Sequence, residues 1–254
     1  MASTGLECLP AADPFRFRTE AFDGQSRQVL FTEDFESMNV GDNGRTIGPW
    51  RTEYAAGREQ HIIVVDPSAL GTGDSSPPVL PPLGRRAMEF ANTVKVKGKQ
   101  GRQLNAMLWR ELDGKNLPAR CKLLVECDIS PRTSMVEPSL SLTHDYPLRL
   151  APGLALSEEA DPAAAKLEWR PDQWYRIRAV WNVEQGAPRG ATVERLQWRG
   201  ADGWFRDASV QLPAPKRVSD PMAQLRFGFP APITGKAGGT YWLDNVKVEV
   251  LEEK

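Results

Sequence analysis

The sequence predicts an all-β protein built as a sandwich of two antiparallel sheets. Short runs of β-branched and aromatic residues recur along the chain, separated by clusters drawn from its 21 Gly and 21 Pro. Within several runs apolar and polar residues alternate, which is typical of antiparallel strands with one packed face and one solvated face. About a dozen such strands exceed what one open sheet holds comfortably, so two packed sheets are expected.

The strands are identified by residue type and by the turn signals that bound them. We expect them, in chain order, at residues 29–36, 49–54, 61–66, 86–91, 104–110, 120–129, 139–142, 147–151, 174–182, 191–199, 204–211, 222–229 and 240–251. One short helix is expected within residues 157–168, where Pro162 restricts the residue at which it begins.

Alternation is clearest in residues 120–129 and 174–182, where it predicts which side chains reach solvent. In the first strand the odd-numbered positions are apolar, so Glu126 and Asp128 fall on the opposite face. The corresponding face of the second strand holds Trp174, Arg176 and Arg178. We expect both of these polar faces to be solvated.

We expect one β-sandwich domain at residues 26–254, preceded by a flexible segment at residues 1–25, because no composition shift or internal repeat marks a second domain. No run approaches the ~20 apolar residues of a membrane helix, and the first residues lack the pattern of a signal peptide. We expect a secreted or cell-envelope protein whose leader lies outside this sequence. The residues do not distinguish it from a cytoplasmic protein.

The charge balance argues against a nucleic-acid-binding protein, and the positions of Cys121 and Cys127 argue against a disulfide between them. The 32 basic and 33 acidic residues give a net charge of −1, whereas general nucleic-acid binding requires a basic excess. Cys121 and Cys127 lie in one expected strand and are separated by roughly 20 Å, too far for a disulfide. Both share the apolar parity of that strand, so we expect buried thiols.

The opening and closing strands carry a family resemblance. The run FTEDFE at 31–36, followed by Gly41 and Trp50, combines with WYRIRAVWN at 174–182 and YWLDNVKVEV at 241–250. Together they resemble the concanavalin A-like lectin/glucanase superfamily, especially its laminin-G-like branch. The resemblance implies a jelly-roll sandwich, a fold that hosts lectins, hydrolases, lyases and adhesion modules.

Asp244 poses a physical problem in the closing strand, because a period of two places it among Trp242 and the following valines. An unpaired carboxylate in an apolar layer costs several kcal/mol, so it needs a cation or hydrogen-bond donors. In the resembling superfamily a structural calcium often joins the first and last strands. This implies calcium held by Asp244, with Glu33 or Glu36 as further ligands. The alternative is that Asp244 caps a turn or pairs with an arginine.

The sequence contains no complete catalytic set. Laminarinase-type members of the superfamily carry Glu-x-Asp-x-x-Glu on one strand, and Glu126 and Asp128 match only its first two carboxylates. With His144 and Tyr146 they are candidates for a divergent acid/base site of a lyase or glycoside hydrolase. A solvated charged pair is the alternative interpretation of Glu126 and Asp128.

Eight tryptophans suggest an aromatic surface that binds pyranose rings. Arginines beside such rings would suit an anionic glycan, because guanidinium pairs bidentately with carboxylate or sulfate. The candidate binding residues are Trp109, Trp174, Arg176, Arg178, Gln224 and Arg226.

These patterns predict a carbohydrate-binding or adhesion-type module of an exported protein, with an anionic polysaccharide as partner. A polysaccharide-degrading enzyme with a divergent site is the first alternative. A scaffold domain of an envelope protein that binds no glycan is the second.

Overall fold

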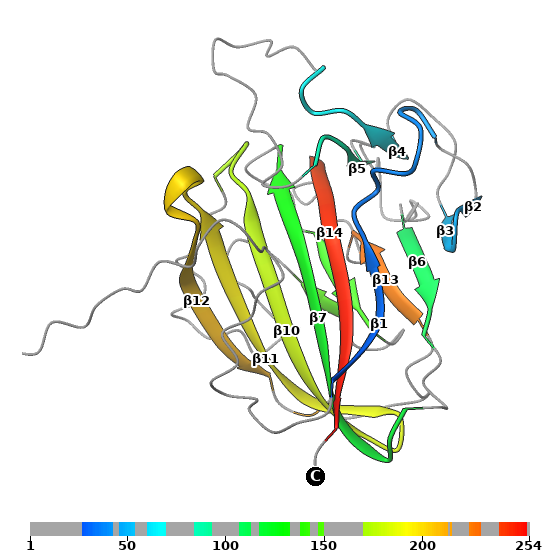
Figure 1. Ribbon diagram of the computed structural model, residues 1–254, viewed down its shortest axis with the longest axis vertical. Helices are drawn as coiled ribbons and strands as arrows, with labels where there is room; N and C mark the ends of the chain where they lie inside the picture. Colours follow the sequence, from blue (N-terminus) through cyan, green and yellow to red (C-terminus); the bar gives the residue numbers. More distant parts are fainter. Residues whose placement is uncertain are drawn as a thin grey trace, which may run out of the picture.

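Figure 1 shows a computed structural model of the chain. The structure describes residues 27–42, 46–53, 60–69, 84–92, 107–112, 117–132, 138–142, 147–149, 170–212, 214, 224–229 and 239–252. These residues form two antiparallel sheets and one short 3-10 helix, η3 (Gly200–Asp202). The predicted two-sheet sandwich is therefore confirmed.

The larger sheet has eight strands, which fill the front of the view in Figure 1. In spatial order they are β12 (Trp204–Leu212), β11 (Ala187–Trp198), β10 (Tyr175–Glu184), β7 (Arg120–Pro131), β14 (Gly239–Glu252), β5 (Ala87–Asn92) and β4 (Gln60–Val65), with β1 (Arg27–Glu33) also paired to β14. The first and last strands of the chain thus lie side by side, as the resemblance implied.

The smaller sheet has six strands. In spatial order they are β2 (Thr46–Ile47), β3 (Trp50–Glu53), β6 (Met107–Glu111), β13 (Gln224–Gly228), β8 (Ser139–Ser141) and β9 (Pro147–Arg149). Every strand expected from the sequence overlaps one of the observed strands, and β2 is the one that was not predicted. The expected helix within 157–168 and the expected flexible segment at 1–25 lie outside the described residues.

The main core lies between the two sheets and follows the predicted alternation. Trp50 of β3 shows how the sheets join: its ring centroid is 5.8 Å from that of Phe31 in β1 and 6.1 Å from that of Phe227 in β13. Cys121 and Cys127 are free, buried thiols in this core, as expected. Burying each large apolar side chain contributes about 1.5–3 kcal/mol, so this layer is the main source of stability.

The opposite face of the larger sheet differs from the prediction. Antiparallel alternation predicted a solvated surface, but Glu126 and Asp128 are at most 1% exposed, and Arg176 is 3% exposed. We call this second face the buried charged face. Its fully or nearly buried charged members are Glu126, Asp128, Arg176, Asp244, Lys247 and Glu249. For Glu126, Asp128 and Arg176, alternation predicted the correct side of the sheet but the wrong environment for that side.

A β-bulge in β14 corrects the prediction for Asp244. Asp244 pairs with Asp128 and Lys247 pairs with Glu126, so the register shifts between these two positions. Asn245 has a φ of 49°, a left-handed conformation that asparagine adopts more readily than most residues. The bulge reverses the parity of the strand: the following valines face the core, while Asp244 lies on the buried charged face.

Candidate functional site

The best-formed ion pair on the buried charged face joins Asp128 of β7 to Arg176 of β10. The two residues are direct cross-strand partners. Arg176 donates from Nε to Asp128 Oδ1 at 2.7 Å and from Nη2 to Asp128 Oδ2 at 2.8 Å. This bidentate geometry satisfies both groups where water is excluded. It explains why neither residue contributes a free charge to a binding surface.

Glu126 is held in the next row along the same strands. Arg178 donates from Nε to Glu126 Oε2 at 3.1 Å, and Arg178 Nη1 lies 3.5 Å from Glu194 Oε2 on β11. Signs alternate across four strands in the order Lys247, Glu126, Arg178 and Glu194. Burial raises the pKa of Glu126, against the lowering effect of the two arginines.

These contacts change the interpretation of the predicted catalytic pair. Glu126 and Asp128 were expected at a solvated surface, but their carboxylates are buried and already bound to arginine. Arg176 was expected to meet a glycan and is instead buried, whereas Arg178, expected in the same role, is 22% exposed and pairs with Glu126 and Glu194. The two other candidates for acid/base chemistry, His144 and Tyr146, lie outside the described residues.

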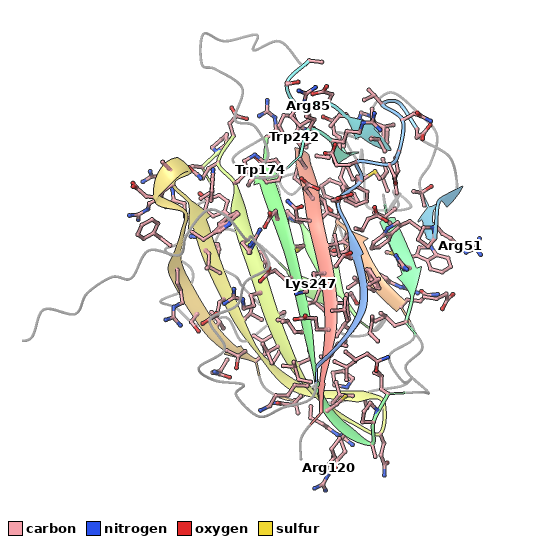
Figure 2. The ribbon with its side chains drawn as sticks, in the orientation of Figure 1. Arg51, Arg85, Arg120, Trp174, Trp242 and Lys247 are labelled. Carbon is pink, nitrogen blue, oxygen red and sulfur yellow. The ribbon has the colours of Figure 1, made fainter. Side chains whose placement is uncertain are left out.

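Trp174 was expected to be exposed and is instead fully buried. It belongs to a small aromatic cluster at one end of the buried charged face, where its ring centroid lies 6.3 Å from that of Trp242. Figure 2 shows these two rings side by side at the upper end of the larger sheet. Trp242 also donates from Nε1 to Glu89 at 2.9 Å, so the cluster satisfies its polar atom internally. It is a second core.

The three carboxylates predicted as calcium ligands each accept hydrogen bonds from protein donors. Glu33 accepts from the backbone N–H of Phe35 and from Trp50 Nε1, each at 3.1 Å. One oxygen of Glu36 accepts from two successive backbone N–H groups, those of Arg85 and Arg86. Asp244 accepts from the N–H of Asn245 at 2.7 Å, inside strand β14.

Within the described ranges no group of three or more His, Cys, Asp or Glu side chains is placed to hold a metal ion. Calcium at Glu33, Glu36 and Asp244 stays a prediction. A rise in melting temperature when calcium is added to chelated protein would support it. An unchanged melting temperature would count against it.

The remaining candidates meet on the outer face of the smaller sheet. Trp109 of β6 pairs directly with Arg51 of β3 on one side and with Arg226 of β13 on the other. Their neighbours Trp50, Leu108 and Leu225 are buried in the core, so alternation places this row on the outer face. Arg51 is exposed, while Trp109 and Arg226 are partly exposed. In Figure 2 Arg51 projects away from the sandwich at the right of the view.

Polar contacts fix one side of this row. Arg226 donates from Nε to Gln224 Oε1 at 2.9 Å, and Gln224 Nε2 lies 3.4 Å from Glu111 Oε1. The Arg51 guanidinium carbon lies 5.7 Å from the Trp109 ring centroid, within reach of a cation–π contact. We call the surface formed by Arg51, Trp109, Glu111, Gln224 and Arg226 the Trp109 face.

The sequence identified three of these five residues and missed two. Arg51 and Glu111 lie in short strands whose alternation is weak on its own, and only the register shows that they flank Trp109 and Gln224. Parity within 104–110 and 222–229 could have suggested the faces. Parity does not show which strands, far apart in the chain, lie next to each other in the sheet.

No protein-family model matches the chain, and no curated protein matches it in sequence. Solved structures resemble it in fold at low identity. The GH131 β-glucanase catalytic domain from Podospora anserina is 11% identical with a TM-score of 0.48, and the match covers 89% of this chain and 96% of that one. A cyclase from Fischerella sp. TAU is 12% identical with a TM-score of 0.42, covering 89% and 98%.

An arabinose-bound α-L-arabinofuranosidase is 7% identical with a TM-score of 0.36. The match covers 86% of this chain but only 25% of the arabinofuranosidase, so the chain spans about a quarter of that protein's length. Similarities at this level carry no argument about fold or function.

Proposed function

We propose that this protein is a carbohydrate-binding module that binds an anionic polysaccharide on the Trp109 face. The observation that carries the proposal is the single row Arg51–Trp109–Arg226, in which a tryptophan pairs with an arginine on each of the two neighbouring strands. All three side chains reach the surface, whereas Arg176 of the larger sheet is buried.

The chemistry of the row suits an acidic sugar. An indole ring offers a flat apolar surface for the C–H face of a pyranose, and its burial by ligand gains free energy from displaced water. A guanidinium beside the ring binds carboxylate or sulfate through two parallel N–H groups. The cation–π contact of Arg51 is worth only about 0.5–1 kcal/mol at an exposed site, so a ligand can displace it at small cost.

The arginines of the buried charged face are less suited to binding an anionic glycan. Arg176 already binds Asp128 bidentately, and Arg178 lies between Glu126 and Glu194. An incoming anion would have to displace a buried carboxylate, which would then be left without its cation at a cost of several kcal/mol. The Trp109 face requires no such exchange.

The test is calorimetric titration of the protein with acidic and neutral polysaccharides. We expect binding to an acidic polysaccharide, and we expect Trp109→Ala to weaken it at least about tenfold, or 1.4 kcal/mol. Trp198→Ala is the matched control, because this partly buried tryptophan lies on the larger sheet. Melting temperatures of both variants exclude misfolding as the cause. Full binding by a folded Trp109→Ala variant would overturn the proposal.

A further inference from the structure

The Trp109 face also suggests how charge is distributed along the ligand; this step rests on the proposed function. We infer that the polysaccharide carries acidic groups on alternate sugars, with a neutral sugar stacked on Trp109 and the acidic sugars on either side bound by Arg51 and Arg226. The ligand class is therefore an alternating acidic–neutral polysaccharide, rather than a polymer in which every sugar is acidic.

The register sets the spacing. Arg51 and Arg226 lie two strands apart, with Trp109 midway between them. Neighbouring strands are about 4.8 Å apart, so the two arginine backbones are separated by roughly 10 Å, about the length of a disaccharide unit. A chain crossing the strands along this row would bring every second sugar to an arginine, and the sugar between them would lie over the indole.

Glu111 disfavours a charge on the central sugar. It lies two residues after Trp109 on the same face of β6 and is exposed. A residue two positions along a strand is about 7 Å away, so an acidic group on a sugar above the indole would lie within reach of this carboxylate. Like charges at this distance repel, and an exposed carboxylate offers such a group no hydrogen-bond donor.

Gln224 adds to the selectivity by orienting Arg226. Its Oε1 accepts from Arg226 Nε, and its amide reaches toward Glu111, so one side chain links the cation on one side of the row with the carboxylate beside its centre. A guanidinium held in place loses less side-chain entropy when it binds an anion. The Trp109 face thus combines one oriented guanidinium, that of Arg226, with the indole of Trp109 and the guanidinium of Arg51. The Glu111 carboxylate beside the indole repels a charge on the central sugar.

The experiment compares three hexasaccharides by calorimetric titration: alternating glucuronate and N-acetylglucosamine, an oligogalacturonate with every sugar acidic, and neutral laminarihexaose. We expect the alternating ligand to bind most tightly, although the oligogalacturonate carries more charge. Replacing either Arg51 or Arg226 by Gln should weaken the alternating ligand about tenfold, the loss expected for one charge-assisted hydrogen bond. Glu111→Gln should strengthen oligogalacturonate binding and leave the alternating ligand nearly unchanged.

Arg120→Gln is the matched control, because the Arg120 side chain is 76% exposed and lies at the lower end of the view in Figure 2, away from Arg51. It should leave all three affinities unchanged. Equal or tighter binding of the oligogalacturonate through Trp109 would overturn the alternation and leave the proposed function standing. If no acidic glycan binds, or if Trp109→Ala has no effect, the proposed function itself fails.

Discussion

Asp244 lies directly opposite Asp128 in the antiparallel pairing of β14 with β7, and both carboxylates are buried. The two differ in their partners. Asp128 is neutralised by Arg176 and also accepts from Asn245 Nδ2 at 2.9 Å, whereas Asp244 is held by the backbone and side-chain N–H groups of Asn245. Burial raises the pKa of Asp244 well above its usual value, and the neighbouring Asp128 charge raises it further.

This arrangement predicts a loss of stability at high pH. A carboxyl group whose pKa is raised in the folded protein binds a proton there more tightly than in the unfolded chain. Its contribution is fully present below the unfolded pKa near 3.8 and is lost as the pH rises through the folded pKa. Asp244→Asn keeps a neutral acceptor at this position and removes the titration.

We therefore expect Asp244→Asn to be more stable than the wild type at pH 8, so that it unfolds at a higher urea concentration. The difference should shrink as the pH falls below 3.8, where Asp244 is protonated in both states. A variant that is less stable than the wild type at pH 8 would show that the Asp244 charge is needed.

Arg176→Met should destabilise the protein strongly. The substitution removes the guanidinium and leaves the Asp128 carboxylate buried beside Asp244, and breaking one side of a buried ion pair costs about 3–5 kcal/mol. Urea unfolding measures the change. Arg206→Gln is the control, because Arg206 pairs with Glu194 at a side chain 64% exposed, and its loss should cost less than about 1 kcal/mol.

A double variant separates the loss of a cation from the loss of packing. Arg176→Met combined with Asp128→Leu replaces the pair by apolar side chains, and we expect it to recover part of the stability lost in the single variant. If the double variant is as unstable as the sum of both single changes, the orphaned charge is not the cause.

Gly84→Ala should destabilise the protein where Gly84, which precedes β5, packs against Glu36, which follows β1. Gly84 has a φ of 76°, and a Cβ there would clash with Glu36, whose carboxyl carbon would be 2.9 Å away. Glu36 has little freedom to yield, because its oxygen accepts the N–H groups of Arg85 and Arg86. We expect a loss of at least about 2 kcal/mol, combining the left-handed backbone cost with the clash.

Gly200→Ala provides the matched control for that prediction. Gly200 also has a positive φ, 65°, but a Cβ there meets nothing within 4 Å. It should therefore lose only the backbone contribution of about 1–2 kcal/mol, measured by thermal or urea unfolding. Equal losses in both variants would mean that the Glu36 contact has no energetic role.

Strand positions were predictable because they depend on local pattern. The alternation in residues 120–129 correctly gave the core face of β7, and thereby the burial of Cys121 and Cys127. Parity failed in the closing strand, because one left-handed residue, Asn245, inserts a bulge that a strict period of two does not contain. Asparagine favours such conformations, but the letter alone does not show that it adopts one.

The sequence identified several residues of the candidate site but not which of them lie together. Trp109, Gln224 and Arg226 were selected together with Trp174, Arg176 and Arg178, although the two sets lie on different sheets. Nothing in the spacing of β6 and β13 along the chain shows that they pair, since pairing between distant strands depends on the whole topology. Arg51 and Glu111 enter the site only through that pairing.

The sequence by itself determined a two-sheet antiparallel sandwich, its strands and the inward parity of most of them, because these follow from residue type and the two-residue period of a strand. Only the tertiary structure decided which polar face is buried and which is open. A period of two separates the sides of a sheet and carries no information about what covers each side. For that reason Glu126, Asp128, Arg176 and Arg178 became internal ion pairs, and Trp109 with its flanking arginines became the surface available to a ligand.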